Sequence, residues 1–222
     1  MTTHRALVLG ATGLIGRHLL RALLDSPHWQ SVQVLTRRPL GFRHDKLHET
    51  VLPLEQMASR PDLFAVDDVF CCLGTTLRAA GSRSAFRQVD FDYCVQAAEL
   101  ARAQGADHFL VVSAVNASAR SRVFYSRTKG QMEEAVEALD FRALTIMQPS
   151  LLLGDRSEFR TGERLAAAGM QLLRPVLGWT DADWLPVEAA TVARAMLVAA
   201  REPVSGVRRL RYSDIQRLAG IN

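Results

Sequence analysis

Tyr125 and Lys129 are the two side chains of this sequence whose types and spacing most clearly suit chemistry. Both fall in segment 121–139, which is predicted to be helical, and a spacing of four residues places them on one helix face. A tyrosine ionises at about pH 10 in water, and a neighbouring ammonium group lowers that pKa by favouring the phenolate. Such a tyrosine could donate a proton to a carbonyl oxygen while hydride reaches the carbon. The alternative is an exposed helical pair, but the chain has only one other lysine, Lys46.

A third group would have to polarise the substrate oxygen, and Ser113 is the candidate. It ends the predicted strand 108–113, twelve residues before Tyr125. Its hydroxyl would point into the same crevice as the tyrosine. A serine that simply terminates a strand is the alternative interpretation, and Asn116 and Ser118 are reserves for the role.

Three glycines, Gly10, Gly13 and Gly16, predict the turn that would bind a cofactor. They follow the apolar run 6–9 and precede leucines at helical spacing over 14–24, so they connect a strand to a helix. Gly10 would take the backbone angles of a tight turn. Gly13 would let a pyrophosphate approach the main chain, and Gly16 would let the helix pack close to the sheet. The N–H groups at the helix start would face the phosphates. A glycine turn in another kind of α/β protein is the alternative.

The end of the next predicted strand, 31–36, indicates which dinucleotide would bind. In such folds this position contacts the adenosine ribose, and an NAD site usually has Asp or Glu there. The chain instead has Thr36, Arg37 and Arg38, about twenty residues beyond Gly16. An arginine suits the 2′-phosphate of NADP by its charge and its forked geometry. The sequence therefore predicts NADP(H), with two surface arginines of an arginine-rich chain as the alternative.

Strands and helices alternate along most of the chain. This alternation predicts βαβ units and an α/β fold with a doubly wound parallel sheet, the Rossmann fold. Ligands bind at the carboxyl ends of the strands in such sheets, so the loops after the strands can converge on one crevice. We expect a single domain over 1–222, with 151–222 contributing a small lid on the substrate side. The predicted strands are 5–9, 31–36, 50–54, 67–73, 108–113, 141–147 and 207–212, and the predicted helices are 14–24, 54–59, 84–104, 121–139, 165–173 and 187–200.

The composition argues against several other classes. The formal charge is +4 and the pI is about 9.3, but the arginines are scattered, so no nucleic-acid partner is predicted. No apolar run approaches ~18 residues, so no membrane-spanning helix is expected. Three cysteines make no disulfide framework, which indicates a reducing, cytoplasmic setting. His44 and His48 are four residues apart, but no carboxylate or cysteine pattern completes a zinc site, so no metal is predicted.

Several motifs resemble the short-chain dehydrogenase/reductase superfamily over most of the chain. Besides the glycine turn, they are Cys-Cys-Leu-Gly-Thr-Thr at 71–76, Val-Asp-Phe-Asp-Tyr at 89–93, Phe-Tyr-Ser-Arg-Thr-Lys-Gly at 124–130 and Leu-Leu-Gly-Asp-Arg at 152–156. The last three, in this order, are similar to the atypical members grouped with the Tat-interacting oxidoreductase.

The resemblance implies a Rossmann domain that binds NADP(H), and it assigns residues to each part of the cofactor. By this resemblance, the pyrophosphate lies against Gly10, Thr12, Gly13, Leu14, Ile15 and Gly16. The ribose phosphate lies against Arg37, and the adenosine side lies against Leu73, Gly74 and Thr75. The nicotinamide lies against Tyr125, Lys129 and the loop Gln148, Pro149 and Ser150.

Two residues depart from the family pattern. Ala114 follows Ser113 where many relatives have a second serine, and Asp90 stands where extended members often have asparagine. We expect an NADP(H)-dependent reductase of a small carbonyl compound, with Tyr125 as general acid. The departures favour the alternative, an NADP(H)-binding regulatory or interaction protein with little turnover. An isomerase or epimerase that recycles its cofactor fits less well, because the C-terminal part is short. The substrate, any protein partner and the oligomeric state are not specified.

Overall fold

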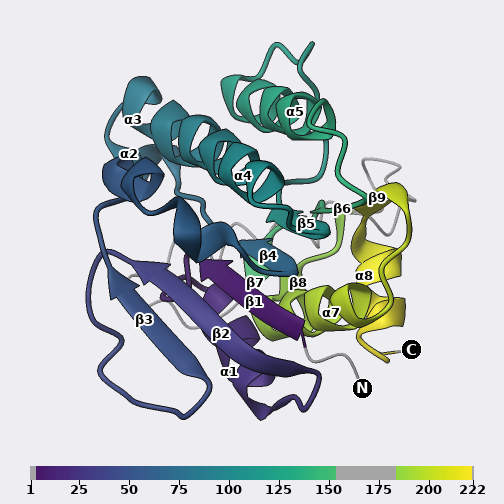
Figure 1. Cartoon of the computed structure of the whole chain (residues 1–222). Helices are drawn as coiled ribbons and strands as arrows, with labels where there is room; N and C mark the ends of the chain where they lie inside the picture. The colour runs from purple at the N-terminus through teal and green to yellow at the C-terminus, as the bar shows by residue number, and fades with distance from the viewer. Residues whose placement is uncertain (1–3, 154–183, 222) are drawn as a thin grey trace.

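The computed structural model describes residues 4–153 and 184–221. Its centre is a parallel sheet (Figure 1) whose strand order confirms the predicted doubly wound fold, because the chain crosses over between β1 and β4. In the order in which they lie side by side, the strands are β3 (Leu47–Val51), β2 (Trp29–Thr36), β1 (His4–Leu9), β4 (Asp68–Cys71), β5 (His108–Val112), β6 (Ala143–Met147) and β9 (Gly206–Leu210).

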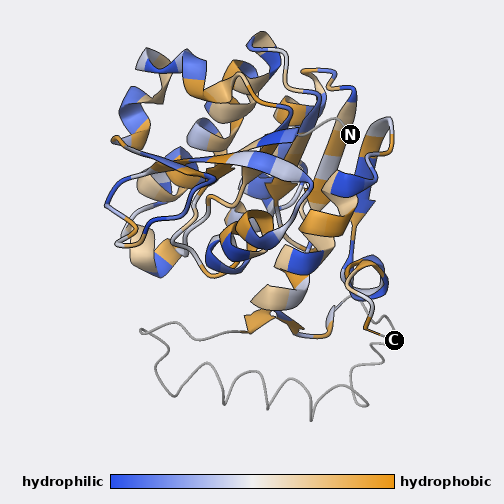
Figure 2. Ribbon diagram, turned by 60° about the horizontal axis from the view of Figure 1, so that its bottom comes forward, coloured by the Kyte–Doolittle hydropathy of each residue, from blue (hydrophilic) through white to orange (hydrophobic). Residues whose placement is uncertain are grey.

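Helices cover both faces of the sheet, and the side chains of each strand alternate between the two cores. Ala6 and Val8 of β1 enter one core, while Leu7 and Leu9 enter the other. Figure 2 shows that the flanking helices carry both hydrophobic and hydrophilic residues, as expected when one helix face is buried. The first core lies under α1 (Gly16–Asp25), α7 (Ala189–Arg201) and α8 (Tyr212–Leu218), and the second under α4 (Tyr93–Ala103), α5 (Phe124–Glu137) and the 3-10 helices Leu54–Ser59 and Pro61–Phe64.

Helix α1 is stabilised by its buried face rather than by its first turn. Leu19, Leu20 and Leu23 are buried against the sheet, and burying one such side chain contributes about 1.5–3 kcal/mol. The N-cap residue, Ile15, makes no side-chain hydrogen bond to the first turn, and such a cap contributes only about 1 kcal/mol. Burial of the leucines therefore contributes more to the stability of α1 than a capping side chain would. The helix start has no capping side chain that would compete with an anionic ligand.

The predicted helix over 84–104 is wrong as one continuous element. Gly81, at φ +77°, ends the short helix α2 (Leu77–Ala80) in the left-handed conformation. The Ser82 hydroxyl then accepts a hydrogen bond from the Ala85 N–H and starts α3 (Arg83–Arg87). A π-helical turn, Gln88–Asp92, separates α3 from α4 and turns the Asp90 side chain into the interior. Such turns often mark functional sites.

The C-terminal part shares in the main layers. Strand β9 pairs with β6, and α7 packs against α1. The short strands β7 (Leu152–Leu153) and β8 (Val187–Glu188) pair with each other. The predicted helix 165–173 lies outside the described residues, so the lid stays a prediction.

Helix α8 was not predicted, and β2 and β3 begin two and three residues before the predicted positions. Among the described residues, no helix is both long and apolar enough to cross a membrane.

Candidate functional site

The glycine turn after β1 brings two backbone segments into close contact. Gly10 has φ +78°, and a Cβ atom there would stand 2.6 Å from the carbonyl oxygen of Cys72, just after β4. A Cβ on Gly16 would stand 2.1 Å from the Gly10 carbonyl oxygen. The Gly13 N–H donates a hydrogen bond to that same oxygen at 2.9 Å. Only glycine fits at positions 10 and 16, so the turn is compact and its main chain is open to a ligand.

A crevice of about 450 Å³ opens at the carboxyl ends of β1, β2 and β4. This is the topological switch point, where ligands bind in open α/β sheets. Seven of the residues predicted for the cofactor line it: Gly10, Thr12, Gly13, Arg37, Leu73, Gly74 and Thr75.

The other predicted cofactor residues lie elsewhere. Leu14 and Ile15 are buried in the packing of α1, and Gly16 is the first residue of that helix. Arg38 is exposed but does not line the crevice. Gln148, Pro149 and Ser150 follow β6, where Gln148 and Pro149 are buried and the Ser150 hydroxyl donates to the Leu185 carbonyl.

Among the crevice residues that were not predicted, Glu55 is the acidic one. Glu55 is exposed on the crevice wall, and its carboxylate interacts with Arg37. Its pKa is lowered by backbone hydrogen bonding, by the nearby Tyr93 hydroxyl and, more weakly, by Arg37. The wall that would meet the adenosine ribose therefore presents one cation and one carboxylate.

Lys129 is buried directly beneath the crevice. Its Nζ forms an ion pair with Asp90 Oδ1 at 2.8 Å and donates to the Val112 carbonyl at 3.2 Å. Burial alone would lower the pKa of Lys129, but the attraction of Asp90, Cys94 and Tyr125 together with the Asp90 hydrogen bond outweighs it, so the pKa is raised. A Cβ on Gly74 would stand 3.9 Å from Nζ, so the ammonium lies next to the crevice floor. The Thr75 N–H donates to Asp90 Oδ2 at 2.9 Å, which fixes the loop after β4.

The pKa of Tyr125 shifts in the direction opposite to the one expected from the sequence. Its half-buried ring packs 5.5 Å from the Phe86 ring. Burial raises the pKa of Tyr125; Lys129 lowers it and Asp90 raises it further, so the net shift is upward. The predicted influence of Lys129 is present, but the expected net lowering of the pKa is wrong in this structure. The phenol is therefore protonated at neutral pH, as a proton donor must be.

Ser113 has a partner that the sequence did not predict. Its hydroxyl donates to Glu133 Oε1 at 2.5 Å, so its hydrogen is directed at that carboxylate. Glu133 also accepts two hydrogen bonds from Gln148 Nε2, each 3.0 Å, and pairs with Arg209 at 3.3 Å. Glu133 continues the four-residue spacing of Tyr125 and Lys129 along α5, and that spacing was the signal that could have identified it.

A family model described as NAD(P)H-binding matches residues 10–203, which include the glycine turn, the crevice and α5. The chain belongs to this NAD(P)H-binding family.

Relatives of this NAD(P)H-binding chain cover most of its length. Protein HTATIP2 of Rattus norvegicus is 37% identical over 210 residues, 93% of this chain and 85% of that protein. The mitochondrial protein FMP52 of Saccharomyces cerevisiae is 33% identical over 177 residues, 76% of each chain. These similarities confirm the family resemblance stated from the motifs.

Solved structures confirm the fold of this family member. A short-chain dehydrogenase/reductase superfamily protein from Agrobacterium tumefaciens with bound NAD has a TM-score of 0.71 at 18% identity, covering 98% of this chain and 81% of that one. MoeE5 in complex with UDP-glucose and NAD has the same TM-score and identity, covering 97% and 82%. Identities this low support the fold alone.

The residues of the crevice fit a dinucleotide. The side-chain-free cradle of Gly10 and Gly13 leaves the main chain open, and α1 starts beside it without a capping side chain. Anionic phosphates are favoured at such a helix start. Arg37 supplies a cation farther along the same wall.

Proposed function

We propose that the protein is an NADP(H)-dependent reductase of a small carbonyl compound. The observation that carries the proposal is the position of Lys129, whose buried ammonium lies beneath Gly74 on the crevice floor. Tyr125 precedes it by one helical turn on the same face of α5. The proposal thus combines a cradle suited to a dinucleotide with a protonated phenol suited to a carbonyl oxygen. Tyr125 itself is not among the residues that line the crevice.

The residues of the chain have distinct roles in this mechanism. The dinucleotide, when bound, supplies hydride to the carbonyl carbon. Tyr125 donates its phenolic proton to the carbonyl oxygen, and Lys129 stabilises the resulting phenolate. Asp90 holds the Lys129 ammonium and the Thr75 N–H together, so it fixes the catalytic helix to the crevice wall. Ser113 polarises the substrate only if its hydroxyl turns away from Glu133.

We propose that Arg37 selects the 2′-phosphate of NADP(H). Arg37→Ala is expected to weaken NADPH binding by about tenfold because a charge-assisted hydrogen bond is lost, and to leave NADH binding almost unchanged. Fluorescence titration with each dinucleotide measures both affinities.

Arg38→Ala is the matched control, since Arg38 is an adjacent exposed arginine that does not line the crevice. It should leave both affinities unchanged. Equal losses in the two variants would refute a specific role for Arg37. A wild-type preference for NADH would instead indicate that Glu55 accepts the ribose 2′-hydroxyl.

A second function, an NADP(H)-binding regulatory protein with little turnover, is favoured by the Lys129–Asp90 ion pair. Asp90 neutralises the ammonium and also raises the pKa of Tyr125. NADPH consumption over a panel of small aldehydes and ketones distinguishes the two functions. Turnover supports the reductase, and binding without turnover on the whole panel supports the regulatory protein.

The cytoplasmic setting also stays a prediction, since FMP52 of yeast is named mitochondrial.

A further inference from the structure

A group of histidines with one aspartate lies at the sheet edge opposite the crevice. His4, Asp68 and His108 are the first residues of β1, β4 and β5, and His28 directly precedes β2. These strands are neighbours and run parallel, so their amino ends share one edge of the sheet. The fold thus gathers residues that are far apart in the sequence.

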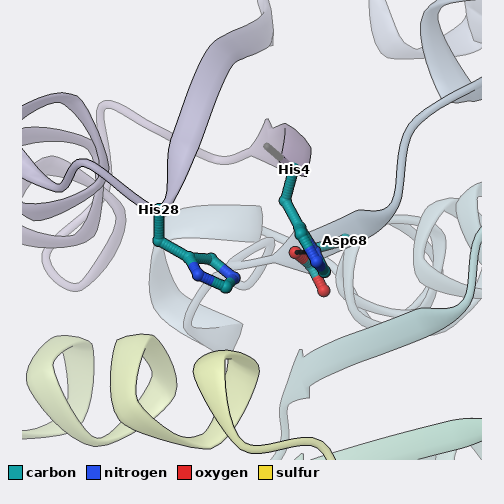
Figure 3. A group of neighbouring side chains, drawn as sticks. All are labelled: His4, His28 and Asp68. Carbon is teal, nitrogen blue, oxygen red and sulfur yellow. Dashed lines mark hydrogen bonds and ion pairs between the residues drawn. The ribbon is translucent and has the colours of Figure 1, made fainter. Parts of the chain in front are cut away.

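Three of these side chains converge closely. Figure 3 shows His4, His28 and Asp68 meeting from three separate segments. One imidazole nitrogen from each histidine and one carboxylate oxygen all lie within 4.8 Å of one another. His4 Nδ1 is 3.1 Å from Asp68 Oδ2, and the His4 and His28 rings are 4.4 Å apart at their centroids. The His4 N–H also donates to the His28 carbonyl at 3.1 Å, so the two backbones are joined.

Two nitrogens of this group are buried without a partner. Among the described residues, neither His28 Nε2 nor His108 Nδ1 has a hydrogen-bond partner. Buried polar atoms are nearly always paired, so each such atom calls for an explanation. His108 Nδ1 lies 3.8 Å from Asp68 Oδ1, while its Nε2 contacts the Thr145 hydroxyl at 2.9 Å.

The side-chain types of the group also suit a cation. Neutral imidazole and a carboxylate are the forms that ligate a metal.

We propose that His4, His28 and Asp68 bind a divalent transition metal of the zinc class. Two imidazoles and one carboxylate form a common zinc ligand set, and a water completes the coordination. Zinc bonds to these atoms measure about 2.0–2.2 Å, so small side-chain rotations bring the three ligands to one ion. The indole N–H of Trp29 donates to Asp68 Oδ2 at 2.8 Å and orients the carboxylate. His4 is partly exposed and gives the ion a path from solvent.

The metal would link the amino ends of strands β1 and β4 and the turn before β2. Because the ligands converge only in the folded chain, binding would stabilise the fold. The site is at the sheet edge opposite the crevice, so its test does not depend on the proposed reductase activity.

The test is a titration of Zn²⁺ into the metal-free full chain near neutral pH, followed by calorimetry. We expect one Zn²⁺ per chain and a higher Tm with Zn²⁺. His28→Ala should weaken Zn²⁺ binding at least about tenfold. Losing only a residue that hydrogen-bonds to a metal ligand already lowers metal affinity by about that factor. This variant should also abolish the rise in Tm. His44→Ala/His48→Ala removes two exposed histidines elsewhere and should change neither result.

Two measurements keep the test decisive. If His28→Ala does not fold, the visible absorption of Co²⁺ bound to the wild-type chain reports nitrogen ligation without any variant. An intense tetrahedral-type spectrum that Zn²⁺ abolishes supports the site. Equal Zn²⁺ affinity in the wild type and in folded His28→Ala would overturn the proposal, as would a wild-type chain without saturable Zn²⁺ or Co²⁺ binding.

Discussion

Tyr125→Phe is expected to lower kcat for carbonyl reduction by about 10²–10⁴-fold, the usual contribution of a general acid. NADPH affinity should stay nearly unchanged, because phenylalanine keeps the ring that packs against Phe86. Steady-state kinetics with the best substrate of the carbonyl panel and a fluorescence titration with NADPH measure the two quantities separately.

The pH dependence of the wild type belongs to the same prediction. Since the pKa of Tyr125 is raised above its ordinary value of about 10, the phenol is protonated throughout the neutral range. Turnover that depends on this acid should be present below that pKa and lost as the pH rises through it. Tyr212→Phe, on α8 rather than on α5, is the control and should retain activity. Undiminished turnover by Tyr125→Phe would exclude the proposed mechanism.

Gly10→Ala is expected to abolish NADPH binding and to destabilise the fold. The added Cβ would stand 2.6 Å from the Cys72 carbonyl oxygen, a backbone atom that cannot move without shifting the loop after β4. That loop and the glycine turn form the crevice wall, so their displacement removes the cradle for the phosphates. Chemical denaturation and NADPH titration measure the two effects.

Gly41→Ala provides an unusually close control. Gly41 has the same φ of +78°, but a Cβ there would meet nothing within 4 Å. The strain of an alanine at positive φ, about 1–2 kcal/mol, is therefore common to both variants. Gly10→Ala should lose a further ~1–3 kcal/mol from overpacking. If the two variants lose equal free energy of unfolding and both bind NADPH, the steric account of the turn is wrong.

The fold could be predicted from the sequence because its determinants are local. Apolar runs and helical leucine spacing specify each βαβ unit, and the handedness of the connections then limits the topology. The glycine turn was predictable for the same reason, since Gly10, Gly13 and Gly16 act within one strand–turn–helix unit.

The partners of the candidate catalytic residues could not be predicted, because they come from distant segments. Asp90 reaches Lys129 only because a π-helical turn rotates it inward. Glu133 meets Ser113 and Gln148 only where α5 crosses the ends of β5 and β6. The net rise of the Tyr125 pKa also depends on burial, which the spacing of Tyr125 and Lys129 does not reveal. The grouping of His4, His28 and Asp68 likewise follows from strand order alone.

The most direct test of the central claim is a fluorescence titration of the wild-type protein with NADPH and NADH, measured side by side. We predict saturable NADPH binding and clearly weaker NADH binding. The glycine cradle would bind the pyrophosphate of both dinucleotides, whereas Arg37 would bind the 2′-phosphate that only NADPH carries. Absence of binding of either dinucleotide would contradict the assignment of the crevice as the cofactor site.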